Sequence, residues 1–207
     1  MMAAARALGP VLAAAAVVSI AAHALSCAAE GEGAPVSTLP SDGRLSQGVA
    51  ERLHPALPLQ VPVAQVGVED LVDTFDDLRG TDRRHEALDI PAARGTPVHA
   101  VDDGEVVKVF LSKPGGLTVY QFDRTRSVAY YYAHLDGYAA GLTEGQMLHR
   151  GDAIGEVGST GNADPAAPHL HFAVFELGPE RQWWKGRAVN PLPLFLDASS
   201  AASISPR

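Results

Sequence analysis

The chain has 207 residues, a length expected of one or two domains. It carries 16 Lys and Arg against 24 Asp and Glu, a formal net charge of −8. This balance argues against nucleic acid or anionic lipid as the main partner, because binding to phosphate requires clustered basic side chains. Apolar residues make up 46% of the chain and charged residues 19%, which excludes disorder throughout. The single cysteine, Cys27, excludes an internal disulfide framework and a zinc site built from cysteines.

The first 27 residues have the features of an export signal. Arg6 is the only formal charge before Glu30, and an Ala/Val-rich stretch runs from Val11 to Ala22. A short basic start, an apolar stretch of this length and small residues after it predict a secretory signal peptide. The segment 24–27 resembles a bacterial lipobox, in which the cysteine becomes the acylated first residue, although alanine stands where that motif usually has leucine. Cys27 is therefore a candidate for lipid attachment.

Three outcomes for this segment remain open. Acylation of Cys27 would give a membrane-attached lipoprotein, and cleavage after Ala24 or Ala28 would give a secreted protein. An uncleaved segment could also serve as a membrane anchor, because residues 7–29 carry no formal charge. We expect an exported protein of the cell envelope, either periplasmic or a membrane-anchored lipoprotein.

The composition of the chain changes along its length. We expect a signal peptide at residues 1–27, a flexible spacer at 28–63, one folded domain at 64–197 and a flexible tail at 198–207. Gly and Pro recur through the spacer, which has no sustained apolar periodicity.

The predicted domain consists of short apolar runs separated by Gly and Pro, without long helical periodicity. Closely spaced strands without βαβ alternation predict a mostly β domain, an antiparallel β-sandwich or barrel-like fold. The predicted strands are Thr96–Val101, Glu105–Phe110, Leu117–Phe122, Ser127–Leu135, Ala153–Val157 and His169–Glu176.

Two short segments combine residues that could bind a cation. His85 and Asp89 are four residues apart in a segment expected to be extended or looped, and a hydrogen-bonded surface pair is the alternative. His169 and His171 lie two apart in a predicted strand, so both imidazoles share one face. Either they approach one cation or they face solvent.

A third segment contributes His134, near the end of a predicted strand. Strict alternation places Val128, Tyr130, Tyr132 and His134 on one face of that strand. A lone strand histidine usually has a structural role. Combined with the other two segments, however, it completes a set of catalytic residue types.

A catalytic zinc site takes three protein ligands and leaves a position open for water. The sequence offers His85, Asp89 and one histidine of the pair His169 and His171, with two further imidazoles remaining. Zinc lowers the pKa of bound water to about 7, and neutral imidazoles can then move a proton or stabilise an oxyanion. These residues alone do not tell which histidine of the pair binds the metal.

Residues 73–195 resemble the lysostaphin/LytM-type zinc metallopeptidases (M23 peptidases), which cut peptide cross-links in bacterial cell walls. Many short blocks occur in the order found in that family, which makes the resemblance far more specific than any one motif. The blocks are residues 84–92, 95–98, 103–106, 132–135, 151–155, 158–162, 168–172 and 189–191.

The resemblance implies a β-sheet with an open groove and one zinc ion per domain on its floor. His85, Asp89 and His171 match the family's zinc ligands, and His134 and His169 match the pair that flanks the metal-bound water and the oxyanion. The implied function is a zinc-dependent endopeptidase that hydrolyses peptide cross-links or stem peptides of peptidoglycan.

A second function class remains open. Some members of this family have lost zinc ligands and activate separate cell-wall amidases, so the alternative is a non-catalytic activator. Every ligand position is occupied in this sequence, which argues against it. A third alternative is an enzyme whose groove is blocked by its own N-terminal segment.

The sequence departs from the family pattern at two places. Ala87 stands where glycine is usual, which is tolerable if that residue does not need a positive φ. Residues 163–167 replace a loop that is commonly of Ser/Thr-Gly type, so substrate preference is open. The pair Trp183 and Trp184 either lies at the groove rim, where it could stack on a sugar or peptide, or covers part of the core.

Overall fold

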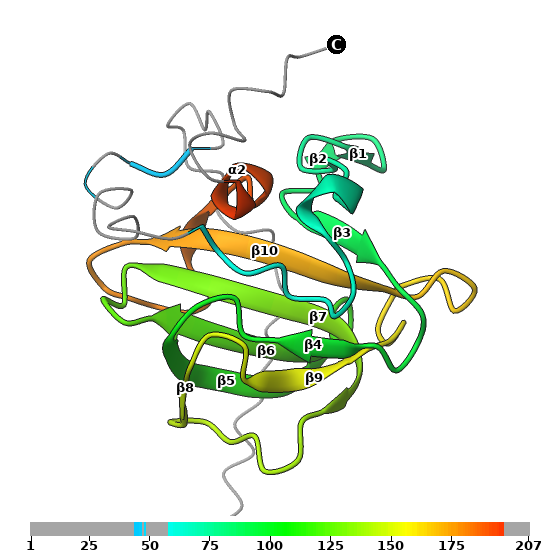
Figure 1. Cartoon of the computed structure of the whole chain (residues 1–207). Coiled ribbons are helices and arrows are strands. Elements are labelled where there is room, and N and C mark those ends of the chain that lie inside the picture. The colour runs from blue at the N-terminus through cyan, green and yellow to red at the C-terminus, as the bar shows by residue number, and fades with distance from the viewer. Residues whose placement is uncertain (1–43, 47, 49–57, 197–207) are drawn as a thin grey trace, which may run out of the picture. The chain divides into compact units, whose positions relative to one another are not determined.

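The computed structural model describes residues 44–46, 48 and 58–196 (Figure 1). The predicted signal peptide, Cys27, most of the predicted spacer and the predicted tail lie outside these residues. Within the described ranges, no helix is both long and apolar enough to cross a membrane. The elements are η1 (Val68–Asp70), β1 (Leu78–Arg79), β2 (Arg83–Arg84), β3 (Leu88–Pro91), β4 (Pro97–His99), β5 (Gly104–Ser112), β6 (Gly116–Asp123), β7 (Val128–Tyr138), β8 (Met147–Leu148), β9 (Ala153–Val157), β10 (His169–Leu177), β11 (Gly186–Val189) and α2 (Leu192–Phe195).

Nine of the strands form one sheet, whose main path runs β11-β10-β7-β6-β5-β8, while β1 and β2 form a separate hairpin. β10 and β7 lie side by side in this sheet (Figure 1). β3 pairs with the first half of β10, and β9 pairs with both the end of β7 and β4. Every pairing between the described strands is antiparallel, so the expected mostly β, antiparallel fold is confirmed.

All six predicted strands are present, with ends shifted by a few residues. The prediction did not include the two-residue strands β1 and β2, which pair with each other, or β3, β8 and β11, which have four, two and four residues. Segments this short carry too few residues for a periodic pattern, and β3 ends at Pro91, which indicates a loop in the sequence. β3, β8 and β11 form because their longer neighbours, β10 and β5, provide the hydrogen-bonding edge.

One face of the sheet is covered by the hydrophobic core. On β10, Leu170 and Phe172 are fully buried, and they alternate with the partly exposed His169 and His171. Residues from β4, β9 and α2 join the same core cluster. The alternation of β10 therefore separates a buried face from a face that is free to carry a site.

His134 lies on the face opposite to the one predicted by strict alternation. Tyr130 and Tyr132 are fully buried in the core, whereas the His134 ring lies 5.0 Å from the ring of His169. His134 has a φ of 61°, in the left-handed region, and the pairing of β6 with β7 is irregular nearby. Its backbone N–H donates to Gly115 O at 2.8 Å, in the turn between β5 and β6. This backbone turn brings the imidazole to the open face.

Residues 59–63, the last part of the predicted spacer, contact the folded domain, as expected for the residues from Val61 onward. The Leu59 N–H donates to Leu194 O and the Gln60 N–H donates to Val101 O, at 2.8 and 3.0 Å. Val63 forms an isolated bridge with a residue of β4 and is buried in the core.

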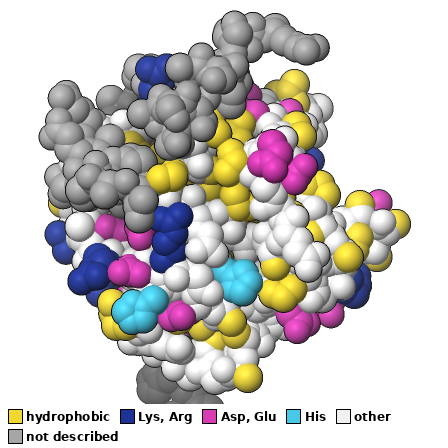
Figure 2. Space-filling model, viewed as in Figure 1, with side chains coloured by type: hydrophobic (Ala, Val, Ile, Leu, Met, Phe, Trp, Pro, Cys, Tyr) yellow, Lys and Arg dark blue, Asp and Glu magenta, His cyan; other side chains and the backbone are white. Residues whose placement is uncertain are grey.

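Charged side chains of both signs are intermixed on the face shown in Figure 2. Two ion pairs involve the turn between β6 and β7. Arg126 in this turn pairs with Glu105 on β5 at 2.6 Å, and Arg124 pairs with Asp103, just before β5, at 3.1 Å. Partly exposed pairs of this kind contribute about 0–1 kcal/mol each. The stability of the domain therefore depends mainly on its apolar core.

Replacing Phe172 with Ala should lower the free energy of unfolding by about 3–5 kcal/mol. The ring is fully buried between Tyr132 and Phe195, and its loss leaves a cavity. Chemical denaturation followed by circular dichroism measures the change. Leu111→Ala is the control: Leu111 is 72% exposed, so its substitution should change the free energy by no more than about 0.5 kcal/mol. Equal losses in the two variants would contradict this placement of the core.

Candidate metal centre

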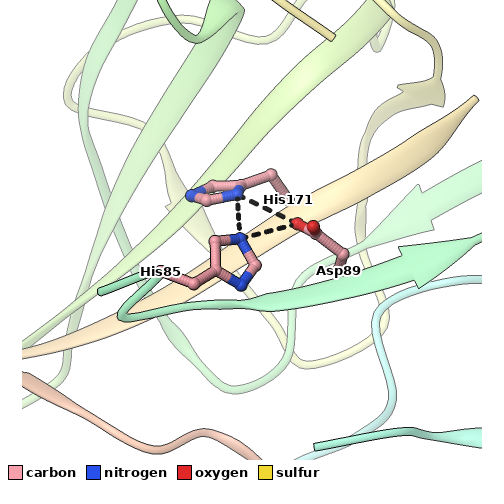
Figure 3. A group of neighbouring side chains, drawn as sticks. All are labelled: His85, Asp89 and His171. Atoms are coloured by element: carbon pink, nitrogen blue, oxygen red, sulfur yellow. Dashed lines mark hydrogen bonds and ion pairs between the residues drawn. The ribbon is translucent and has the colours of Figure 1, made fainter. Parts of the chain in front are cut away.

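The pairing of β3 with β10 brings two of the predicted ligands together. Asp89 on β3 lies directly opposite His171 on β10, and directly opposite residues of an antiparallel pair point to the same face. His85 precedes β3 by three residues and is only 6% exposed. Figure 3 shows the three side chains turned toward one another, with Asp89 and His171 on neighbouring strands.

Three potential ligand atoms meet at this point. His85 Nε2 lies 2.9 Å from Asp89 Oδ1 and 3.1 Å from His171 Nδ1, and Asp89 Oδ1 lies 3.1 Å from His171 Nδ1 (Figure 3). A tetrahedral zinc ion with bonds of about 2.0–2.2 Å holds neighbouring ligand atoms about 3.3–3.6 Å apart. The triangle is therefore close to the size that zinc needs. Two imidazoles and one carboxylate also form a donor set suited to zinc.

The lone pairs of these atoms give a second reason to expect a cation. His85 Nδ1 lies 2.9 Å from Thr74 O and donates its hydrogen to this carbonyl, so in the neutral imidazole His85 Nε2 directs a lone pair at Asp89 and His171. A proton on one of the three atoms bridges two of them well, whereas a metal cation attracts all three. The residues present therefore fit a zinc ion.

Thr74 positions both His85 and Asp89. The carbonyl oxygen of Thr74 accepts the hydrogen bond from His85. Its hydroxyl oxygen accepts a hydrogen bond from the Asp89 N–H at 3.0 Å. The same hydroxyl donates to Ala87 O at 3.3 Å. Thr74 is not among the predicted site residues, since nothing in the spacing of a lone threonine before β3 indicates these contacts.

The backbone accommodates Ala87 without strain. The left-handed residue of this loop is its neighbour Glu86, with a φ of 57°, and Ala87 is not among the residues with positive φ. Its methyl group is fully buried. The condition under which alanine can replace the usual glycine is therefore met.

Arg79 on β1 binds the second oxygen of Asp89. Arg79 Nη2 donates to Asp89 Oδ2 at 2.5 Å, which leaves Oδ1 for the two imidazoles. Burial raises the pKa of Asp89, but hydrogen bonds and charge from His171 and His85 outweigh it and hold this pKa well below its usual range. Asp89 is thus a carboxylate at neutral pH. Arg79, like Thr74, is not among the predicted site residues.

His134 and His169 lie beside the cluster. The His134 ring is 5.5 Å from that of His171, and His169 Nε2 is 3.8 Å from Asp89 Oδ1. The second ring nitrogen of His169 donates to Ala167 O at 2.9 Å, so Nε2 is the nitrogen that faces the cluster. All five predicted site residues are therefore gathered on one face of the sheet.

The orientation of His134 is fixed by the loop between β9 and β10. His134 Nδ1 donates to Thr160 O at 2.8 Å, which leaves Nε2 free. Burial lowers the pKa of His134 to about 4, so the ring is neutral at pH 7 and can accept a proton. Gly116 allows the loop to approach, because a Cβ there would lie 2.1 Å from Thr160 Oγ1.

Comparison with known proteins relates this arrangement to a family. The family model of peptidase family M23 matches residues 83–191, just over half of the chain. The L-Ala–D-Glu endopeptidase of Bacillus subtilis is 34% identical over 127 residues, which cover 58% of this chain and 37% of the relative. The DD-carboxypeptidase/endopeptidase Mpg of Neisseria meningitidis is 37% identical over 115 residues, which cover 55% and 23%.

Solved structures show the same fold. The structure of Helicobacter pylori Csd3 matches with a TM-score of 0.53 at 28% identity, over 69% of this chain and 36% of that one. The chain thus aligns with between about a quarter and two fifths of the length of these three proteins. The family match includes all five gathered residues, and the chain therefore belongs to peptidase family M23, a family of metallopeptidases, with His85, Asp89 and His171 as its candidate metal site.

Proposed function

We propose that this chain is a zinc-dependent endopeptidase of the bacterial cell envelope that hydrolyses peptide cross-links or stem peptides of peptidoglycan. The observation that carries this proposal is the convergence of His85 Nε2, Asp89 Oδ1 and His171 Nδ1 within 3.1 Å of one another. The names of the two curated relatives, both endopeptidases, support it. A ligand residue stands at each of the family's three zinc-binding positions in this sequence, which favours catalysis over a role as an amidase activator.

The five residues divide into two groups. His85, Asp89 and His171 would hold the zinc ion. Zinc, when bound, supplies a Lewis acid that polarises a carbonyl and makes water nucleophilic near neutral pH. His134 and His169 would take up the proton of the attacking water, pass it to the leaving amine and donate hydrogen bonds to the developing oxyanion. A neutral His134 suits this role, because it begins the reaction able to accept a proton.

The bond that is cut depends on the groove and the envelope. The names of the two relatives point to different peptide bonds, L-Ala–D-Glu in one and a DD bond in the other. If Cys27 is acylated and the cell has an outer membrane, the expected bond joins D-Ala to a diamino-acid side chain. Residues 163–167 precede Pro168 and His169, and they are the segment that we expect to affect this preference.

The full-length protein, loaded with zinc, should release peptides from purified peptidoglycan, and mass spectrometry should detect them. A chelator should stop the release and added zinc should restore it. His171→Ala should reduce the rate by about 100-fold or more, because it removes one of three ligands. If His171→Ala still stimulated a separate amidase and the wild type released no peptide, the chain would be an activator.

His134→Ala should lose activity and keep the metal. General acid–base catalysis contributes about 10²–10⁴-fold, so a loss of that size is expected while metal analysis still finds one zinc per chain. His149→Ala is the matched control, since the His149 side chain is 87% exposed and lies outside the cluster. Loss of zinc from His134→Ala would contradict the division of roles.

Arg79→Gln should weaken zinc binding by about 10–100-fold, the usual effect of removing a group that orients a metal ligand. Competition with a chromophoric chelator measures the affinity without any activity assay. Arg84→Gln is the control: Arg84 lies on the other strand of the same hairpin and pairs with the exposed Asp76 at 2.6 Å. Equal zinc affinities for the two variants would show that Arg79 does not position Asp89.

A further inference from the structure

Aromatic side chains extend from the metal centre across the open face of the sheet. Tyr131 on β7 lies opposite Tyr120 on β6 and Ala173 on β10, and Ala173 is two residues from His171 on the same strand. These residues therefore share the open face. The ring of Tyr131 is 6.0 Å from that of His171 and 4.5 Å from that of Tyr120. The ring of Tyr120 in turn lies 5.0 Å from Trp183.

This row ends at two adjacent tryptophans in the loop between β10 and β11. Trp183 packs on Phe110 at 5.5 Å and on Tyr120, so it is anchored to the sheet. Trp184 lies 5.2 Å from Trp183 with the two rings nearly perpendicular, and it is 59% exposed. The anchored ring thus presents the second ring to solvent. The pair does not cover the core, because Trp183 packs on two rings that lie outside the core cluster, whereas Trp184 is accessible, as stacking on a ligand requires.

A hollow of about 350 Å³ lies beside the two tryptophans. Its volume is in the lower part of the range of about 300–1,000 Å³ found for small-molecule sites. Glu105 and Phe122 line it from opposite positions on β5 and β6, on the same face as Tyr120. Arg126 donates to Glu105 Oε2 at 2.6 Å and lies over the Phe122 ring at 5.0 Å. Hydrogen-bonding groups are therefore fixed next to aromatic faces.

The charges of the hollow balance. Its lining includes two arginines and two glutamates and no other ionisable side chain. Such a site does not select a charged ligand. It offers hydrogen-bond donors and acceptors, together with the exposed indole of Trp184. These groups match a neutral ligand whose ring has one apolar face and carries several hydroxyl and amide groups. Sugars with N-acetyl groups have this chemistry. The lining charged residues are Glu105, Arg126, Glu180 and Arg181.

We propose that this tryptophan hollow, formed by Trp183, Trp184 and the residues around them, binds an N-acetylated sugar ring. The identity of the natural ligand rests on the proposed function: in peptidoglycan the sugar is the glycan strand to which the peptide is attached. The row of aromatic rings connects the hollow to the metal centre on one face. A peptide bond at His171 and a sugar at Trp184 can then belong to one substrate molecule.

Intrinsic fluorescence tests the site directly, because Trp183 and Trp184 are the only two tryptophans of the chain. Titration of the full-length protein with a trimer of N-acetylglucosamine should give a saturable change in emission. Maltotriose, which lacks N-acetyl groups, should bind at least about 10-fold more weakly. Absence of a saturable change at millimolar trimer, or equal binding of maltotriose, would overturn the proposal.

Isothermal calorimetry on single-residue variants tests whether the N-acetylglucosamine trimer binds in the tryptophan hollow. Trp184→Ala should weaken trimer binding at least about 10-fold, and Trp184→Phe should restore part of it, since an aromatic face remains. Leu111→Ala is the control, because Leu111 is also highly exposed and apolar but lies outside the hollow. Equal losses in Trp184→Ala and Leu111→Ala, or no loss in Trp184→Ala, would overturn the proposal.

Kinetics separate this proposal from the peptidase activity. Trp184→Ala should raise KM about 10-fold for a glycan-linked peptide and leave KM for the free peptide and kcat for both unchanged. A uniform effect on both substrates would contradict a sugar site. The fluorescence titration needs no cleavage, so sugar binding without peptide release would refute the proposed function and leave the hollow as a binding site.

Discussion

The candidate site depends on the pairing of β3 with β10. This pairing places Asp89 opposite His171, although the two residues are 82 positions apart in the chain. On the other face of the same two strands, Ile90 lies opposite Leu170, and both are buried in the core. β3 has only four residues and is too short to be stable alone. Apolar packing on one face thus fixes the distance between two ligand side chains on the other.

The electrostatics of the site follow from that placement. The second oxygen of Asp89 is held by Arg79, and His85 is oriented by a backbone carbonyl, so neither side chain can turn away without losing a hydrogen bond. Lone pairs and negative charge are consequently held close together in a partly buried place. Arg79 compensates part of this charge, and a cation bound between the three ligand atoms would be attracted by all of them. The fold supplies the energy that keeps the donors in position before a metal arrives.

Sequence reasoning predicted the part of this structure that depends on local periodicity. It found the longer strands, and it found that His169 and His171 share a face. Alternation along a strand predicts the same orientation for both histidines, so it cannot tell which one is a ligand. The register of β3 with β10 distinguishes them, since His171 lies opposite Asp89 and His169 lies opposite Pro91. Alternation failed at His134, because a long-range hydrogen bond to the turn between β5 and β6 accompanies its left-handed backbone. Thr74 and Arg79 have no periodic signature at all.

The division of the sheet into two faces also bears on how a polymer could be recognised. The peptides of peptidoglycan, the proposed substrate, carry carboxylates, and a chain with a net charge of −8 offers them no overall attraction. Recognition must then come from shape and from local groups. The alternation that buries Tyr130 and Tyr132 in the core leaves Tyr120 and Tyr131 on the open face, in contact with the metal centre at one end and Trp183 at the other. A row of partly exposed neutral rings suits the proposed substrate, which charge alone would repel.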